Sequence, residues 1–391
     1  MIPEPPRASG EAAASARLAR LLDVAGLFLK LGLVGFGGPG AHVAMMEDEV
    51  VRRRGWLSRE RFLDLVGATN LIPGPNSTEL AIHLGHLRAG WPGLVVAGAC
   101  FIAPAFVVVL ACAWAYVRFG ALPAATSLLY GVKPVIIAVV LQALWGLGRA
   151  ATRTRAIAAV GLASLAAVAA GVHELVVLFV AGAVLAGARW ATEGRPSRTA
   201  HGLLPLLPLA AAPASLAVPF GLAPLFLFFL KVGSVLFGSG YVLLAFLRAD
   251  LVERWGWLTE AQLLDAVAVG QVTPGPVFTT ATFIGYVLGG APGAVLSTVG
   301  IFLPAFVFVA LSGPLVPRIR RSPVAGAFLD GVNVASIALM TLVTMQLARA
   351  AVVDIATLLL ALASAVMLIR FRVNSAWLVL AAAAIGVALR D

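Results

Sequence analysis

Residues 29–38 read LKLGLVGFGG, and residues 230–239 read LKVGSVLFGS, which is nearly the same string 201 positions later. Two further motifs repeat at the same offset of 201: GWL at 55–57 and 256–258, and PGP at 73–75 and 274–276. A one-residue deletion then lowers the offset to 200, at which PAF (104–106 and 304–306) and GV (131–132 and 331–332) repeat. So many ordered matches predict two copies of one structural unit.

The composition places this duplicated unit in lipid. Of the 391 residues, 61% are hydrophobic and 12% are charged, with a mean hydropathy of +0.98. Soluble domains are nearer 45–50% apolar and about 25% charged. The net charge of +10 comes mostly from arginines in short runs between apolar stretches, as in cytoplasmic loops of membrane proteins. We therefore predict an all-α polytopic membrane protein with a lipid bilayer, and no nucleic acid, as its partner.

Each half has the same predicted order of segments. A glycine-broken helix comes first, two short segments split by PGP come next, and four longer spans follow: 21–38, 60–72, 76–89, 92–117, 123–147, 156–171 and 174–189 in the first half, and 222–239, 261–273, 277–289, 293–316, 324–347, 355–370 and 374–389 in the second. About 20 apolar residues are needed to cross a bilayer. The short segments are therefore interpreted as re-entrant or broken helices, with ordinary loops as the alternative.

The chain accordingly divides into a cytoplasmic tail (1–20), an N-terminal repeat (21–190), a linker with room for an extra span at 203–219 (191–221) and a C-terminal repeat (222–391). At four pairs of equivalent loops, the repeat that has more arginines alternates. The first loop of the N-terminal repeat has Arg52, Arg53, Arg54, Arg59 and Arg61, and its C-terminal counterpart has Arg248 and Arg254; in the third loop the N-terminal repeat again has more, with Arg149, Arg153 and Arg155 compared with Arg349. In the second loop the C-terminal repeat has more, with Arg318, Arg320 and Arg321 compared with Arg118, and in the fourth it has Arg370 and Arg372 where the N-terminal loop at 171–174 has no arginine. Because basic loops stay in the cytoplasm, the two repeats are predicted to have inverted topology.

Two lysines occupy equivalent places inside apolar segments, Lys30 and Lys231. A membrane-embedded cation is costly unless it is paired or hydrated. Each lysine precedes a glycine-rich break whose backbone N–H groups could attract an anion. We predict an anion site at the lysines and the breaks, including Gly37, Gly38, Gly238 and Ser239. The alternative is that each lysine reaches the membrane interface.

The PGP turns are predicted hinges, because proline ends a helix and glycine lets a backbone approach a ligand. Their residues are Pro73, Gly74, Pro75, Pro274, Gly275 and Pro276. Neutral hydrogen-bonding side chains surround them and would suit a releasable oxyanion: Asn70, Asn76, Ser77, Thr78, Gln271, Thr273, Thr279 and Thr280. A tight hairpin with capping residues is the alternative.

Glu79, His83 and His86 share one helical face and have no counterparts in the second half. They are predicted to couple transport to protons, because histidine titrates near neutrality. The alternatives are an interfacial polar face or a metal site, although Glu-x3-His-x2-His is not the HExxH order. No metal or cofactor is predicted.

Several other polar residues also carry predictions. His42 is a further unmatched candidate for the site. Lys133 is expected either at the interface or paired with its repeat equivalent, Asn333. Asp64 and Asp265 match across the repeats and either cap helices or pair with loop arginines, and residues 47–49 are interpreted as a solvated loop face.

The sequence resembles the chromate transporter family of bacterial inner-membrane proteins, in its long two-domain form. The resemblance covers nearly the whole chain and rests on ordered motifs: Phe36-Gly37-Gly38-Pro39 with His42, Gly55-Trp56-Leu57, Pro73-Gly74-Pro75 and Pro104-Ala105-Phe106, with the whole repeated. In the second copy Ser239-Gly240 replaces Gly-Pro, so identical binding by both halves is not expected. The resemblance implies antiparallel halves and export of chromate, which confers chromate resistance.

We therefore predict a secondary transporter, not an enzyme, that exports a tetrahedral dianion with chromate as the leading cargo. The sequence has no GxxxxGK[ST] loop for ATP. Uptake or exchange of sulfate, which has the same charge and shape, is the first alternative. A membrane-embedded enzyme using the Glu79 cluster is the second, and a homodimer is left open.

Overall fold

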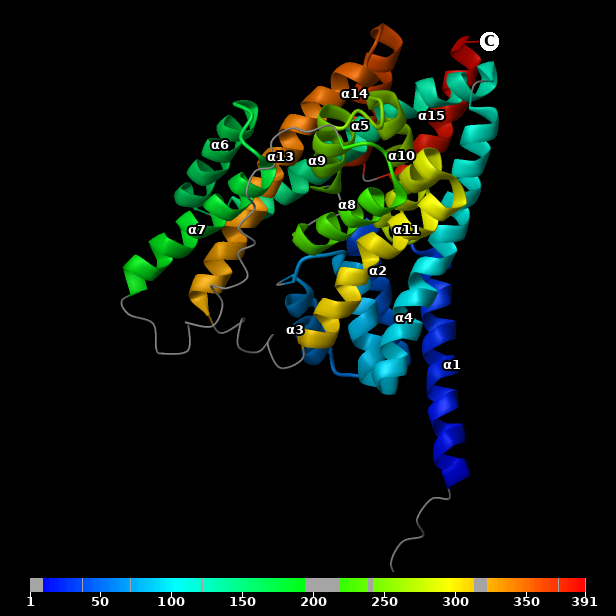
Figure 1. Ribbon diagram of the computed structural model, residues 1–391, viewed down its shortest axis with the longest axis vertical. Coiled ribbons are helices and arrows are strands. Elements are labelled where there is room, and N and C mark those ends of the chain that lie inside the picture. Colours follow the sequence, from blue (N-terminus) through cyan, green and yellow to red (C-terminus); the bar gives the residue numbers. More distant parts are fainter. Residues whose placement is uncertain are drawn as a thin grey trace, which may run out of the picture.

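The computed structural model describes residues 10–36, 38–70, 72–120, 122–152, 154–193, 218–237, 242–312, 322–371 and 373–390, and within these ranges the regular structure is helical (Figure 1). The N-terminal repeat contains α1 (Gly10–Val34), α2 (Gly38–Glu47), η1 (Asp48–Arg53), α3 (Arg59–Thr69), α4 (Asn76–Phe119), α5 (Pro123–Ala151), α6 (Arg155–Ala169) and α7 (Glu174–Glu193). The C-terminal repeat contains α8 (Leu222–Val235), α9 (Leu243–Phe246), η5 (Leu247–Arg254), α10 (Glu260–Val272), η6 (Val277–Thr279), α11 (Thr280–Ser312), α13 (Pro323–Ala351), α14 (Ile355–Arg370) and α15 (Ser375–Arg390). The predicted all-α membrane fold is confirmed.

The long helices α4 and α11 are each folded back on themselves. Their helical geometry is interrupted at Ala89–Gly90 and at Gly289–Gly290. A Cβ built on Gly85 would lie 2.3 Å from the carbonyl oxygen of Gly93, although eight residues of straight helix span about 12 Å. Glycine at position 90 permits the reversal, because its φ is +67°. The predicted short segments at 76–89 and 277–289 are thus the first arms of two helical hairpins.

Among the described residues, five helical stretches are long and apolar enough to cross a membrane: 76–119, 126–149, 174–192, 277–311 and 323–351. The first and the fourth of these are the two hairpins. Helices α6, α14 and α15, which were predicted as full spans, have only 15 or 16 residues. About 20 are needed to cross alone. Capping side chains set where two of them begin, since Thr154 and Asp354 accept hydrogen bonds from the N–H groups of Ile157 and Thr357. The expected extra span at 203–219 lies almost entirely outside the described residues.

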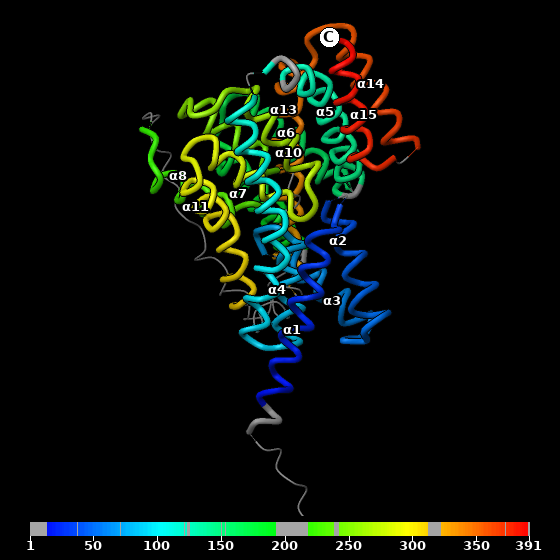
Figure 2. Tube along the Cα trace, turned by 90° about the vertical axis from the view of Figure 1, so that its right-hand side faces the viewer, coloured from blue at the N-terminus to red at the C-terminus, as the bar shows by residue number. Residues whose placement is uncertain are grey.

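The two repeats exchange helices. Helix α5 packs against α14 and α15 of the other repeat, while its counterpart α13 packs against α6 and α7 (Figures 1 and 2). Glycines permit both approaches: a Cβ on Gly131 would lie 1.9 Å from the carbonyl oxygen of Ala382, and one on Gly331 would lie 2.3 Å from that of Ala181. Gly131 and Gly331 are repeat equivalents, and Ala181 and Ala382 lie within one residue of equivalent positions. Such reciprocity is what a two-fold relation between the repeats produces. The orientation of each repeat in the membrane stays a prediction.

The buried side chains form two main clusters. The smaller one is built from α1, α2, η1, α3 and both arms of α4, around Phe28, Phe62 and Phe101. The larger one joins the C-terminal repeat to α5, to α7 and to the second arm of α4. A third cluster of a few residues, including Ile82 and Ala305, connects α4 with α11. The N-terminal α1–α4 unit therefore has a core of its own, and the second arm of α4 joins this unit to the rest of the protein.

Candidate functional site

The two PGP turns cross between the repeats. The N–H of Gly74 donates to the carbonyl oxygen of Leu236, and the N–H of Gly275 donates to that of Gly35, both at 2.8 Å. Residues 74 and 275 are repeat equivalents, as are residues 35 and 236, so the two bonds form a reciprocal pair. Both turn glycines have positive φ, at +137° and +92°, which L side chains rarely adopt. Each predicted hinge is thus attached to the helix break of the opposite repeat.

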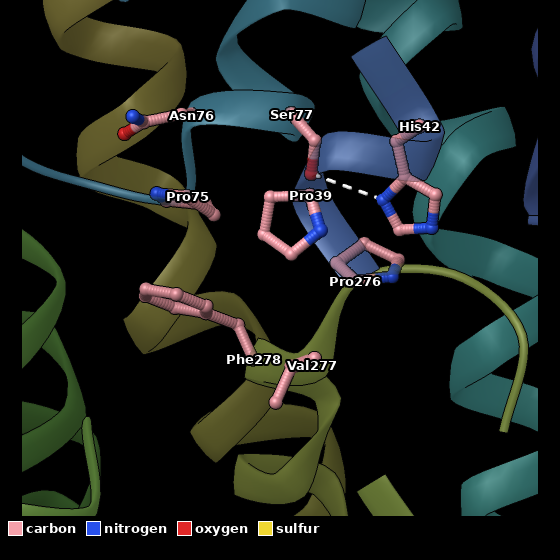
Figure 3. A pocket seen from close by; sticks show the side chains of 8 residues that line it. All are labelled: Pro39, His42, Pro75, Asn76, Ser77, Pro276, Val277 and Phe278. Atoms are coloured by element: carbon pink, nitrogen blue, oxygen red, sulfur yellow. Dashed lines mark hydrogen bonds between the residues drawn. The ribbon is translucent and has the colours of Figure 1, made fainter. Parts of the chain in front are cut away.

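A small pocket opens where these turns meet (Figure 3). It is lined by Pro39 and His42 of α2, by Pro75, Asn76 and Ser77 at the start of α4, and by Pro276, Val277 and Phe278 at the start of η6. Helices α4 and η6–α11 both begin here, after Pro75 and Pro276, without side-chain caps. The first N–H groups of a helix have no acceptor within it and favour anions. Residues 76, 77, 277 and 278, whose N–H groups are the first of these helices, therefore line one pocket from both repeats.

The side chains in this pocket are unequal, although the backbone is symmetric. The N-terminal repeat contributes Asn76, Ser77 and His42, whereas the equivalent residues of the C-terminal repeat are Val277, Phe278 and Leu243. One face of the pocket is polar and the opposite face is apolar. The arrangement therefore provides one composite site and not two equal ones.

His42 is held in a defined orientation beside Ser77. Its Nε2 lies 2.8 Å from the carbonyl oxygen of Gly35, and its Nδ1 lies 3.3 Å from the Ser77 hydroxyl. A carbonyl oxygen can only accept, so Nε2 carries the proton and Nδ1 of the neutral ring accepts from Ser77. The ring also lies edge-on to Phe101 at 5.3 Å. With both side chains buried, His42 fixes the position of the Ser77 hydroxyl at the edge of the pocket.

The predicted lysines do not line this pocket. Lys30 donates to Glu49 at 2.7 Å, and Lys231 donates to Asp250 at 2.5 Å, with the two carboxylates at equivalent positions. Glu49 is buried, so its interpretation as part of a solvated loop face is wrong. The hydrogen bond from Lys30 lowers the pKa of Glu49 below its usual value, against the effect of burial and with help from Arg54. Each lysine charge is therefore already paired, and anion binding by the lysines stays a prediction.

The other predicted binding residues are dispersed. Gly37, Gly238 and Ser239 lie outside the described residues, while Gly38 begins α2 with a φ of +77°. The Asn76 amide donates to Asn70 at 2.6 Å and is turned away from His42 (Figure 3). Gln271 lines a second small pocket with Thr280, and the Thr273 hydroxyl donates to the carbonyl oxygen of Val269. Of the described neutral side chains that were predicted to surround the PGP turns, Asn76 and Ser77 line the pocket between them.

The predicted coupling residues lie on the first arm of α4. Glu79 is fully buried and neither of its carboxylate oxygens has a hydrogen-bond partner among the described residues. His83 is also buried, and His86 packs edge-on against Trp91 at 5.0 Å. Within the described part of the chain, no group of three His, Cys, Asp or Glu side chains is placed to hold a metal ion.

A polar cluster that sequence reasoning did not assemble joins the repeats elsewhere. Lys133 of α5 lies 3.1 Å from the carboxylate of Asp265 in α10, which also accepts from the Tyr116 hydroxyl at 2.9 Å. Lys133 is therefore paired with Asp265 of α10 and not with Asn333, although α13 also packs against α5. Asp64, the repeat equivalent of Asp265, is exposed.

The chain is similar over most of its length to known chromate transport proteins. The family model described as "Chromate transporter" matches the chain twice, at residues 22–188 and 223–387. The "Chromate transport protein" of Cupriavidus metallidurans is 34% identical over 92% of this chain and 90% of its own length. The "Probable chromate transport protein" of Synechococcus elongatus is 32% identical over 86% of each chain, and the "Chromate transport protein" of Pseudomonas aeruginosa is 34% identical over 82% of this chain and 80% of its own. No solved structure matches. The chain is a multi-pass membrane protein that belongs to the chromate transporter family.

Proposed function

We propose that the protein is a secondary transporter that exports chromate across the bacterial inner membrane and thereby confers chromate resistance. The observation that carries this proposal is the pocket between the crossed PGP turns, where the first N–H groups of helices from both repeats meet. The names of the relatives supply chromate as the leading cargo. The site lies within one chain and needs no second copy to complete it.

Neutral donors suit a cargo that has to be released. The backbone N–H groups of Asn76 and Ser77 and the matching groups of Val277 and Phe278 can all donate to an oxyanion. The Ser77 hydroxyl has one proton, which it donates to His42 in this structure, and we propose that this proton turns toward the cargo on binding. No lysine or arginine lines the pocket, so the dianion meets helix dipoles and hydrogen-bond donors instead of a full opposite charge. Such a site binds without holding the anion too tightly for turnover.

The membrane potential is sufficient to drive export. One charge crossing the membrane is worth about 2.3 kcal/mol per 100 mV. A dianion leaving a negative interior therefore gains about 4.6 kcal/mol per 100 mV, roughly a thousandfold or more in concentration. ATP is not needed.

The positions of the two main buried clusters support alternating access. The α1–α4 unit, with its own buried cluster, supplies His42 and Ser77, whereas Phe278 belongs to the larger cluster. Because the PGP turns cross between these bodies, a rocking motion would open the pocket first to one side and then to the other. The reversed loop charges support inverted repeats and hence this mode of access.

Sulfate is the second candidate cargo, in uptake or exchange. Helix N-termini and one hydroxyl recognise charge and tetrahedral shape, which sulfate shares with chromate. Nothing in the pocket lining distinguishes the central atom of the two dianions.

The test is uptake of labelled chromate into inverted inner-membrane vesicles, with sulfate as competitor and with the potential and the pH gradient collapsed separately. We expect uptake driven by the potential, and a loss of roughly tenfold to a hundredfold in Ser77→Ala, because a hydrogen bond to a charged group is worth about 1.5–3 kcal/mol. Ser336→Ala is the matched control, since its buried hydroxyl has no hydrogen-bond partner among the described residues. Absence of chromate uptake under every gradient would refute the proposal.

A further inference from the structure

We propose that Glu79 is the proton-binding site that couples proton binding to anion binding in the pocket, with one proton per transported dianion. This inference rests on the proposed function and names the coupling ion. It starts from the one acidic side chain in the first turn of α4, four residues beyond Pro75 of the PGP turn.

Glu79 has the environment of a neutral carboxylic acid. Its exposed fraction is 0%, and neither carboxylate oxygen has a hydrogen-bond partner among the described residues. Burying an ionised carboxylate without a partner costs far more than burying the neutral acid, so such a group takes up a proton instead. The state described here is therefore the protonated one.

The position of Glu79 connects it to the pocket. A Cβ built on Gly74 would lie 2.4 Å from Oε1 of Glu79, so the carboxyl group packs directly against the PGP turn. The N–H of that same glycine donates across to Leu236 of the other repeat. A change of charge on Glu79 therefore acts both on the hinge and on the pocket formed by Asn76 and Ser77.

The surrounding titratable groups leave this carboxyl without a counterion. Those on the elements packed against α4, and on α4 itself, are Arg17, Arg20, Asp23, Lys30, His42, Glu47, Arg59, Glu60, Arg61, Asp64, Glu260, Asp265, Tyr286, His83, His86, Arg88, Cys100, Cys112, Tyr116 and Arg118. Neither oxygen of Glu79 is hydrogen-bonded to any of them. Asp23 is paired with Arg54 and Arg88, so the nearest arginine of α4 is already engaged.

The sign of the coupling follows from like-charge repulsion. An ionised Glu79 and a bound dianion would compete for the positive end of the same helix, so the dianion favours protonated Glu79. By reciprocity, the proton favours the bound dianion. When the transporter opens to the opposite side, hydration of the turn lets Glu79 release its proton, and the resulting carboxylate expels the anion.

The C-terminal repeat cannot supply a second proton. Its equivalent residue is Thr280, whose hydroxyl donates to the carbonyl oxygen of Val277 at 2.8 Å. With Glu79 as the coupled site and no carboxyl at the equivalent position of the C-terminal repeat, the proposal gives one proton per dianion. The complex then carries one net negative charge across the membrane, which preserves a potential-driven export.

The test measures chromate affinity and proton uptake on purified full-length protein in detergent, from roughly pH 7.5 to pH 9, where chromate itself stays a dianion and buried carboxyls can titrate. For the wild type we expect proton uptake on adding chromate at matched pH, and an affinity that falls by up to tenfold per pH unit. Glu79→Gln mimics the protonated form, so it should bind chromate without proton uptake and without this pH dependence. Glu60→Gln, an exposed glutamate of α3, should behave as the wild type.

The results distinguish a failure of the Glu79 assignment from a failure of the transporter proposal. Chromate binding by the wild type with no proton uptake, or uptake that persists in Glu79→Gln, overturns the assignment of Glu79 and leaves the transporter proposal standing. Absence of chromate binding altogether overturns both. If Glu79→Gln does not fold, the wild type still answers: a protonated-carboxyl band that grows in the infrared difference spectrum on adding chromate supports the inference, and its absence refutes it.

Discussion

Gly131→Ala tests the exchange of helices between the repeats. The added Cβ would lie 1.9 Å from the carbonyl oxygen of Ala382, about 1.5 Å closer than the 3.4 Å at which ordinary contact begins. The obstructing atom belongs to the backbone of α15, so the whole helix has to move and no side chain can rotate away. Overpacking of this kind costs about 1–3 kcal/mol.

The matched control is Gly146→Ala on the same helix, where an added Cβ meets nothing within 4 Å. Alanine is about 1 kcal/mol better than glycine inside a helix, so this variant should be slightly stabilised. Both substitutions raise the helix propensity by the same amount. The difference between their unfolding free energies therefore measures the steric clash alone, which we expect to be about 1–3 kcal/mol. Gly331→Ala, against the carbonyl oxygen of Ala181, should repeat the loss on the opposite side.

The assay is thermal unfolding of detergent-solubilised protein, followed by chromate uptake into vesicles at equal expression. We expect Gly131→Ala and Gly331→Ala to melt below the wild type and to transport less, while Gly146→Ala melts at or above it. If Gly131→Ala melts as high as Gly146→Ala, the close approach of α5 and α15 does not exist and the reciprocal packing of the repeats is wrong.

Three further outcomes are expected. Lys30→Glu should lose most transport activity, and adding Glu49→Lys should restore it if the lysine serves the ion pair; activity that stays lost would support anion binding by the lysine instead. The hydrogen bond from Lys30 lowers the folded-state pKa of Glu49, so the pair stabilises the protein at pH values above the unfolded-state pKa of Glu49. This stabilisation is lost as the pH falls through the folded-state pKa. Melting temperatures of Lys30→Met, measured at decreasing pH, should therefore depend less on pH than those of the wild type. Tyr116→Phe removes the hydroxyl that donates to the buried carboxylate of Asp265 and should lower the unfolding free energy by about 1.5–3 kcal/mol, a prediction that an unchanged melting temperature would contradict.

The sequence determined those features that depend on local chain chemistry. Long apolar runs required lipid, and the repeated motifs required two copies of one unit. Glycine and proline placed the breaks, because they permit or impose backbone conformations that end a helix wherever they occur. The reversal of α4 at Ala89–Gly90 accordingly falls between two segments that were predicted separately.

The tertiary structure decided which distant residues meet. In the structure Lys30 pairs with the buried Glu49, and Lys133 pairs with Asp265 and not with Asn333. These contacts depend on the arrangement of whole helices. The same holds for the pocket: sequence reasoning found the polar residues near the first PGP turn but could not place Phe278 opposite Ser77. Hydropathy and motif spacing specify how each helix behaves in lipid, whereas the exchange of α5 and α13 and the crossing of the PGP turns arise only when both repeats pack together.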